Sequence, residues 1–130
     1  MITKKFRILH TDDDKLLLEV YKKTFEKEGF EVTSMSKLPK DFITEIITIK
    51  PNLIISDIIK PEIDGLELLK RIKTDNHTKD IPFIFLSNMS ADENIAEAKK
   101  LGALEFFVKS KMTVLEVVKE IENLFVLLLV

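Results

Sequence analysis

The sequence LIISDIIKPEIDG, residues 53–65, places a carboxylate at the end of a strongly apolar run. Residues 53–56 form a short and mostly apolar segment, which is typical of a strand that is buried on both faces of a parallel sheet. Asp57 follows this strand directly and precedes a Lys-Pro step and an Asp-Gly turn. Because a charge at the mouth of a buried strand is unusual, this position is the first candidate for a functional site.

Five strand-like segments alternate with five segments of helical periodicity. The strands are expected at 6–10, 30–35, 53–56, 83–86 and 104–108. Their connections are short, and no linker or low-complexity segment interrupts the pattern. Such alternation predicts a parallel sheet that is covered on both faces through right-handed crossovers. We therefore predict a single α/β domain over residues 1–130, a doubly wound flavodoxin-like sheet with the strand order 2-1-3-4-5.

The helical segments are expected to turn one apolar face toward this sheet. In the first, Leu17, Val20, Tyr21 and Phe25 share a face, and Gly29 is placed to stop the helix. Three further helices are expected near 40–49, 66–73 and 92–101, and a last one from about residue 113.

Composition narrows the function classes. The 130 residues are 45% hydrophobic and 32% charged with a net charge of −2, a globular profile that gives no reason to expect nucleic acid or an anionic membrane as partner. The absence of cysteine excludes disulfides, thiolate catalysis and Cys-ligated zinc. The N-terminus has no apolar signal region, and the apolar run 124–130 is shorter than the ~20 residues of a membrane helix. A cytoplasmic protein is expected.

The predicted strand order brings acidic residues together. Ligands of open parallel sheets bind beyond the carboxyl ends of the strands where strand order reverses, here between the first and third strands. Asp12, Asp13 and Asp14 end the first strand and Asp57 ends the third. Carboxylates so close repel one another unless a cation is present, and oxygen ligands without His or Cys suit magnesium. Because Asp is also a preferred N-cap, Asp14 is expected to cap the first helix instead.

Four segments resemble the receiver domain of two-component response regulators. They are ILHTDDD (8–14), PNLIISDIIKPEIDG (51–65), IPFIFLS (81–87) and LGALEFFVKS (101–110), in the order and spacing of that family. The resemblance implies that Asp57 is the phosphoacceptor. It also implies that Asp12 and Asp13 position Mg²⁺, with Asp57 and the backbone carbonyl of Ile59 as further ligands.

The same resemblance assigns the remaining site residues. Ser87 matches the hydroxyl that engages the acyl phosphate, Lys109 matches the lysine that pairs with it, and Phe106 occupies the position of the switch aromatic. The phosphoryl group would come from a histidine kinase, a phosphotransfer protein or a small phosphodonor. The signal would pass to a downstream protein through the face made by the fourth helix, fifth strand and fifth helix. Such a protein is not an enzyme in the usual sense, although it assists its own phosphoryl transfer and slow autodephosphorylation.

Several positions depart from the usual receiver pattern. Ser110 stands where receivers usually have a proline that follows a cis peptide bond. Because a cis bond before serine costs ~2.5–4 kcal/mol, the sequence does not determine whether the Lys109–Ser110 bond is cis or trans. Lys60 replaces an apolar residue, and Asn88 replaces a small one and is expected to crowd phosphodonor access. Ile59 and Met89 stand where receivers place side chains that hold or exclude the hydrolytic water. Because neither makes strong hydrogen bonds, we predict slow loss of phosphate.

Two alternatives remain open. A degenerate receiver would take no phosphate and act only as a protein-docking module. An unrelated flavodoxin-like binder of a nucleotide or flavin is disfavoured, since no Gly-rich loop follows the first strand and the chain has only 3 glycines. His10 and His77 lack partners at metal-ligand spacing and are expected to be structural. The apolar end of the last helix predicts either a homodimer contact or a frayed terminus.

Overall fold

The structure, a computed structural model, describes the backbone of residues 6–60, 62–89 and 91–129, and side chains up to residue 125. Within this part of the chain, five parallel strands form one sheet in the order β2-β1-β3-β4-β5. The strands are β1 (Arg7–Thr11), β2 (Glu31–Met35), β3 (Leu53–Ser56), β4 (Phe83–Ser87) and β5 (Glu105–Val108). The helices are α1 (Lys15–Lys27), α2 (Phe42–Ile49), α3 (Gly65–Thr74), α4 (Asp92–Lys100) and α5 (Val114–Leu129), with a 3-10 turn η1 (Lys109–Lys111) after β5. The predicted flavodoxin-like fold and strand order are confirmed.

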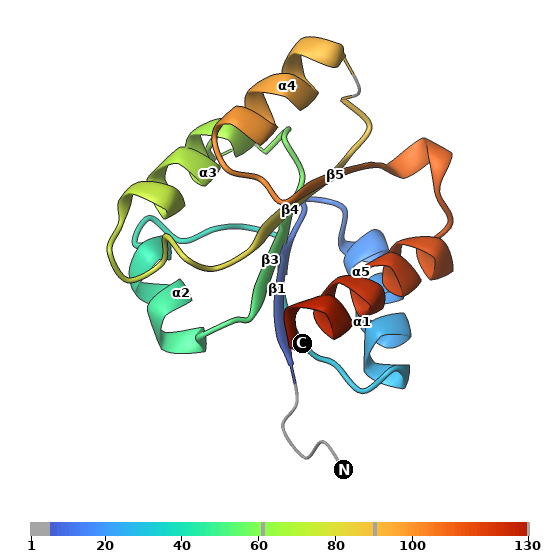
Figure 1. Cartoon of the computed structure of the whole chain (residues 1–130). Helices are drawn as coiled ribbons and strands as arrows, with labels where there is room; N and C mark the ends of the chain where they lie inside the picture. The colour runs from blue at the N-terminus through green and yellow to red at the C-terminus, as the bar shows by residue number, and fades with distance from the viewer. Residues whose placement is uncertain (1–5, 61, 90, 130) are drawn as a thin grey trace.

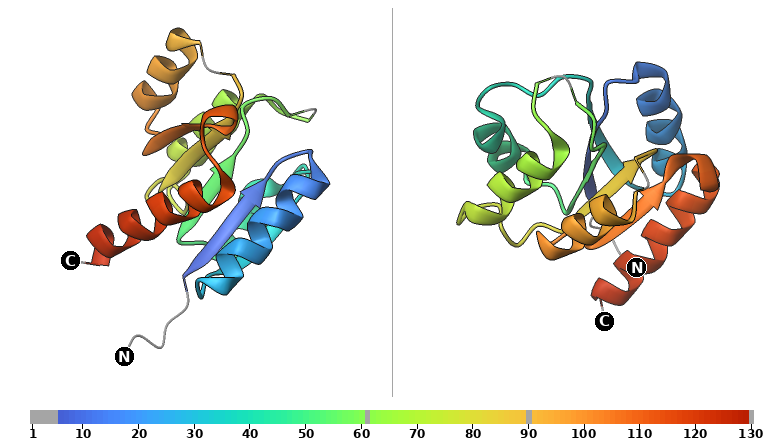
Figure 2. Two further views of the ribbon diagram at one scale, coloured as in Figure 1. Left: turned by 90° about the vertical axis from the view of Figure 1, so that its right-hand side faces the viewer. Right: turned by 90° about the horizontal axis from the view of Figure 1, so that it is seen from above.

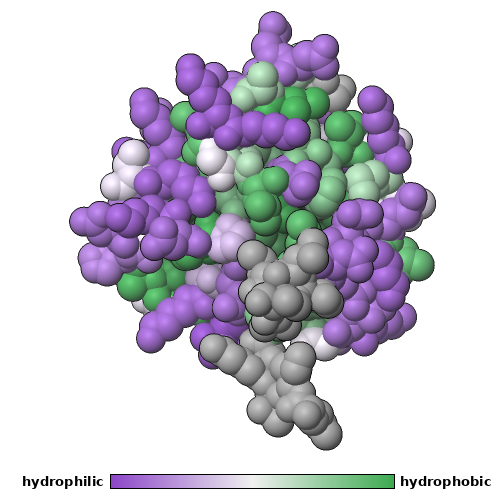
Figure 3. Space-filling model, viewed as in Figure 1, coloured by the Kyte–Doolittle hydropathy of each residue, from purple (hydrophilic) through white to green (hydrophobic). Residues whose placement is uncertain are grey.

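Helices cover the sheet on both sides, as Figures 1 and 2 show: α1 and α5 lie on one face, and α2, α3 and α4 lie on the other. The central strands contribute side chains to a hydrophobic core on each face of the sheet, because successive side chains along a strand point to opposite faces. On β1, Ile8 packs with Phe25 in the first core and Leu9 packs with Phe85 in the second. Hydrophilic side chains dominate the outer helical surface in Figure 3, with hydrophobic ones between the layers.

Two helix predictions need correction. Val20, expected on the inner face of α1, is 43% exposed, and Leu18 is buried in its place. The buried stripe of this helix runs through positions 18, 21 and 25, and Val20 lies outside it. The second helix begins at Phe42 rather than near residue 40. The expected strands also began one residue early at 6, 30 and 104. The Phe30 amide donates to the Phe25 carbonyl and so closes the end of α1 instead of extending β2.

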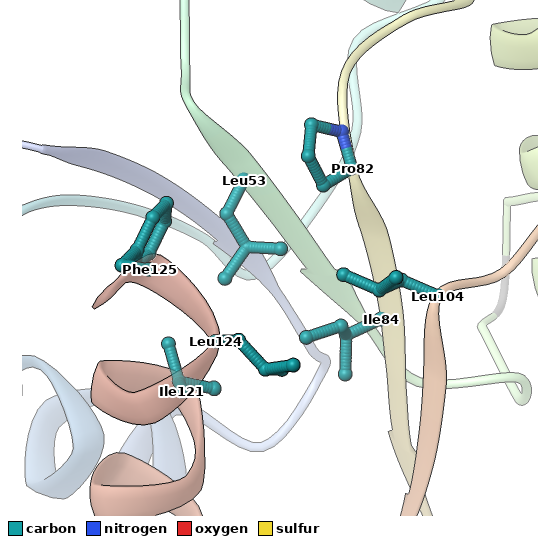
Figure 4. A pocket seen from close by; sticks show the side chains of 7 residues that line it. All are labelled: Leu53, Pro82, Ile84, Leu104, Ile121, Leu124 and Phe125. Atoms are coloured by element: carbon teal, nitrogen blue, oxygen red, sulfur yellow. The ribbon is translucent and has the colours of Figure 1, made fainter. Parts of the chain in front are cut away.

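The last helix belongs to the core as far as its side chains are described. Phe125 stacks on Phe6 with ring centroids 4.6 Å apart, and Ile121 is fully buried. In Figure 4, Ile121, Leu124 and Phe125 face β3 and β4 around a small apolar pocket that also includes Leu53 and Ile84. The side chains of residues 127–129 lie outside the described part, so the homodimer contact stays a prediction. None of the described helices combines the length and apolarity that crossing a membrane requires.

Candidate functional site

The acidic residues meet at the carboxyl end of the sheet because β1 and β3 are neighbours. Thr11 and Ser56 are register partners, so Asp12 and Asp57 leave adjacent strands at the same level. Carboxylate oxygens of Asp12, Asp13 and Asp57 all lie within 4.8 Å of one another. Asp12 and Asp57 are buried, whereas Asp13 is exposed.

Lys109 joins the two buried acids. Its Nζ lies 2.7 Å from Asp12 Oδ2 and 2.7 Å from Asp57 Oδ2, and its side chain is only 15% exposed. The other carboxylate oxygens accept backbone amides: Ile59 N–H donates to Asp57 Oδ1 at 3.3 Å, and Asp14 N–H donates to Asp12 Oδ1 at 2.9 Å. Charge-assisted hydrogen bonds of this kind are short and strong, so the ammonium and both carboxylates are held in fixed positions.

The surroundings shift the pKa values of the two buried acids, Asp12 and Asp57, in opposite directions. Burial opposes ionisation of Asp57, but the hydrogen bond from Lys109 and the nearby Ser87 hydroxyl outweigh it and hold the pKa of Asp57 below its ordinary value. Burial also acts on Asp12, and there it exceeds the effect of Lys109, so the pKa of Asp12 is raised. Burial lowers the pKa of Lys109, but its bonds to both acids raise it overall. Asp57 is therefore ionised at neutral pH, the state that a nucleophile requires.

An open pocket of about 370 Å³ lies over these groups. The β4–β5 register pairs Ser87 with Val108, which brings Ser87 to the level at which Lys109 leaves β5. Ser87 is buried, and its hydroxyl accepts the Met89 N–H at 3.2 Å. The lining of the pocket is Asp13, Asp57, Ile59, Ser87, Asn88, Met89 and Lys109.

Three other predicted residues have clear positions. Phe106 on β5 is half-buried, 5.8 Å from Phe85 between ring centroids, on the side of the sheet that α2, α3 and α4 cover. Ile59 and Met89 lie at the pocket mouth and are 59% and 36% exposed. Asp14 caps α1, since its carboxylate accepts the Leu17 N–H at 3.1 Å, and the expected capping role is confirmed.

Lys60 contributes a contact that the sequence did not reveal. Its side chain has no exposed surface, and its Nζ donates to Thr11 Oγ1 at 2.6 Å and lies 3.5 Å from Glu62 Oε1. The Glu62 carboxylate in turn accepts the Leu38 N–H at 3.2 Å. The ammonium thus joins the loop after β3 to β1, and the Glu62 carboxylate joins the same loop to the loop after β2. The one feature of the sequence that could have indicated this contact is that a lysine occupies a position that is usually apolar in receivers.

The two histidines have no metal-ligating arrangement among the described residues. His10 is fully buried, neither ring nitrogen has a hydrogen-bond partner there, and its ring meets Tyr21 edge-on at 5.5 Å. Burial lowers the pKa of His10 to about 3, and the nearby charges of Lys109 and Lys60 act in the same direction. His77 is largely exposed and lies 3.4 Å from Asp75.

The donor set fits magnesium. Asp12, Asp13 and Asp57 offer only oxygen ligands, as Mg²⁺ prefers, and magnesium sites commonly use one or two carboxylates together with water. The predicted fourth protein ligand, the Ile59 carbonyl, belongs to the residue whose amide already touches Asp57. The Lys109–Ser110 peptide bond, whose cis or trans isomer the sequence did not determine, is trans.

Comparisons with known proteins point in one direction. The sequence profile described as "Response regulator receiver domain" matches residues 8–121. The response regulator SaeR of Staphylococcus aureus is 30% identical over 117 residues, which cover 90% of this chain and 49% of SaeR. A protein-glutamate methylesterase/protein-glutamine glutaminase of Archaeoglobus fulgidus is 32% identical over 105 residues, 79% of this chain and 29% of that protein. The chain thus spans less than half the length of these curated relatives.

Solved structures agree with the profile. The signal receiver domain of a DNA-binding response regulator from Colwellia psychrerythraea superposes with a TM-score of 0.82 at 25% identity, covering 93% of this chain and 98% of that one. The chemotaxis response regulator CheY4 of Vibrio cholerae shares the fold, with a TM-score of 0.81 at 22% identity and coverage of 92% and 98%. A profile match over most of the chain, the strand order and the converged acids lead to one conclusion: this chain belongs to the response regulator receiver domain family.

Proposed function

We propose that Asp57 is the phosphoacceptor of this receiver and that its phosphorylation requires Mg²⁺. The observation that carries the proposal is the bridge of Lys109 between Asp12 and Asp57 at 2.7 Å to each. It supports an ionised acceptor, a cation already in place for the incoming charge, and free carboxylate oxygens for a metal. A degenerate docking module would not need these charges to converge.

The chemistry follows from these positions. A carboxylate oxygen of Asp57 attacks the phosphorus atom, the bond from phosphorus to the donor breaks, and the donor's leaving atom keeps the electron pair. Lys109 and the Ser87 hydroxyl are placed to interact with the oxygens of the transferred group, where such preorganised donors stabilise developing charge. Magnesium held by Asp12, Asp13 and Asp57, when bound, would offset further charge on those oxygens.

Partners and output are part of the same proposal. The donor is a histidine kinase, a phosphotransfer protein or a small phosphodonor, and the phosphate adds roughly 1.5 to 2 negative charges at the pocket. Ser87 is drawn toward these charges, and Phe106 on the neighbouring strand β5 responds to the movement of the β4–α4 loop. The face of α4, β5 and α5 then contacts a downstream protein. Residues 1–130 act as a single receiver domain in this scheme.

Intact mass spectrometry after incubation with acetyl phosphate tests the proposal. The parent protein should gain the mass of one phosphoryl group with Mg²⁺ and none with excess chelator. Lys109→Ala should slow the gain by about 10²-fold, the effect of removing one donor from preorganised charge stabilisation. No gain in the folded parent under any donor and metal concentration would instead favour the docking module.

A further inference from the structure

Two residues that depart from the usual receiver pattern contact each other beside the pocket. The backbone N–H of Ser110 donates a hydrogen bond to Asn88 Oδ1 at 2.9 Å. A proline at position 110 would have no N–H to donate, and an alanine or glycine at position 88 would have no side-chain acceptor. The contact therefore exists only because both positions differ, and Asn88 has a role besides occupying space.

The sheet register explains why these residues meet. Ser87 and Val108 are partners on β4 and β5, so Asn88 and Lys109 are the first residues beyond adjacent strand ends. Ser110 is the second residue of η1, and the first amides of a helix have no partner within it. No side chain caps η1 at its N-cap residue Val108. Asn88 supplies a partner from the neighbouring loop and fixes the turn by which the chain leaves β5.

Fixing this turn bears directly on Lys109. A lysine side chain is long and flexible, and holding its ammonium between two carboxylates costs rotamer entropy. Holding its backbone reduces the number of directions in which the ammonium can point. The observed ammonium is 2.7 Å from both Asp12 and Asp57, so the backbone position is compatible with the full bridge.

We propose that Asn88 is a positioning residue for phosphoryl transfer: its hydrogen bond to Ser110 holds the turn after β5 so that Lys109 is directed at Asp57 before a phosphoryl donor arrives. The inference rests on the proposed role of Asp57. It differs from the expectation that Asn88 acts mainly by crowding the pocket. Removal of the side-chain oxygen at nearly constant volume should slow phosphorylation if Asn88 positions Lys109, and should leave the rate unchanged if Asn88 only crowds the pocket.

Phosphorylation kinetics of four variants distinguish the two ideas. Asn88→Leu removes the acceptor with little change of volume, and Asn88→Asp keeps an acceptor oxygen. At saturating Mg²⁺ and acetyl phosphate, Asn88→Leu should slow labelling of Asp57 by about 3- to 10-fold, the worth of one hydrogen bond, and Asn88→Asp should restore most of the rate. In a Ser110→Pro background the N–H is absent, so adding Asn88→Leu should have no further effect. An unchanged or faster rate of labelling in Asn88→Leu, or equal slowing in both backgrounds, would overturn the proposal.

Nuclear magnetic resonance of the unphosphorylated protein gives an independent readout. The Ser110 amide and the Lys109 ammonium should exchange slowly with solvent in the parent and in Asn88→Asp, and rapidly in Asn88→Leu, with the thermal unfolding midpoint nearly unchanged. An unchanged Lys109 ammonium in Asn88→Leu would exclude a positioning role. Because this result needs no phosphate, it separates failure of the inference from failure of Asp57 to act as phosphoacceptor.

Discussion

The ammonium of Lys60 is buried beside the acidic site, and its burial and its contacts have opposite effects on stability. Taking a charge out of water costs several kcal/mol, and among the described residues Thr11 and the partly exposed Glu62 are the partners that offset this cost. Lys60→Met removes the charge at similar length and leaves Glu62 free to accept the Leu38 amide or contact water. We expect the free energy of unfolding to rise by about 1 kcal/mol, because the cost of burying the ammonium is removed while Glu62, the partner left behind, stays partly exposed to water. Urea denaturation measures it, and a loss above about 2 kcal/mol would show that the hydrogen bond outweighs the burial cost.

At the same scale, we predict that Ile59 and Met89 set the lifetime of the proposed phosphorylated state. Both line the pocket mouth, and neither side chain can orient the water that must attack the acyl phosphate. A positioned polar group that also handles a proton contributes roughly 10²–10⁴-fold in such reactions. Loss of label from the purified phosphoprotein should be slow in the parent and at least about tenfold faster after combined Ile59→Asn and Met89→Glu substitution. Similar decay of both proteins would disprove the role of these positions.

At the scale of elements, the start of α3 is packed against the strand end that carries Asp57. A Cβ added at Gly65 would lie 2.6 Å from the Asp57 carbonyl oxygen and 2.6 Å from Ile58 Cα, both backbone atoms that cannot move aside cheaply. Gly65→Ala should therefore lower the free energy of unfolding by about 1–3 kcal/mol, as overpacking does, and slow phosphorylation of Asp57 because the strand end shifts. Gly29→Ala is the matched control. Gly29 has a positive φ, but a Cβ added there would meet no described atom within 4 Å beyond its chain neighbours, so the substitution should cost about 1 kcal/mol and leave the phosphorylation rate unchanged. Equal rates in the two variants would contradict this account of Gly65.

The strands and helices also show which features of the fold and of the site could be predicted from the sequence. The alternation of strands and helices predicts a parallel sheet, for which the flavodoxin-like order was expected. Such a sheet brings Asp12, Asp57 and Lys109 to one edge because the carboxyl ends of parallel strands lie at the same edge. The exposed Val20 was missed because helical phase depends on which turn contacts the sheet, and several phases fit one apolar pattern. Contacts of Lys60 with Thr11 and of Asn88 with Ser110 depend on side-chain rotamers and loop paths, which no residue pattern specifies.

For the whole molecule, the buried neutral His10 makes stability depend on pH. The unfolded chain binds a proton near the ordinary pKa of 6.5, whereas the folded protein does so only near 3. The stability that this residue contributes is thus present above pH 6.5 and is lost as pH falls toward 3. Between pH 7 and pH 5 the free energy of unfolding should drop by about 2 kcal/mol more in the parent than in His10→Val. Parallel pH profiles of the two proteins would show that the folded state accommodates the protonated ring.

The central claim is that one sheet edge assembles a phosphoacceptor from Asp57 and its charged neighbours. The direct test is to treat the phosphorylated protein with borohydride, which reduces an aspartyl phosphate to homoserine, and to sequence its peptides by mass spectrometry. Homoserine should appear at position 57, only when Mg²⁺ was present, and should be lost in the combined Asp12→Ala and Asp13→Ala protein. Homoserine at another position, or undiminished conversion without those two acids, would contradict the account.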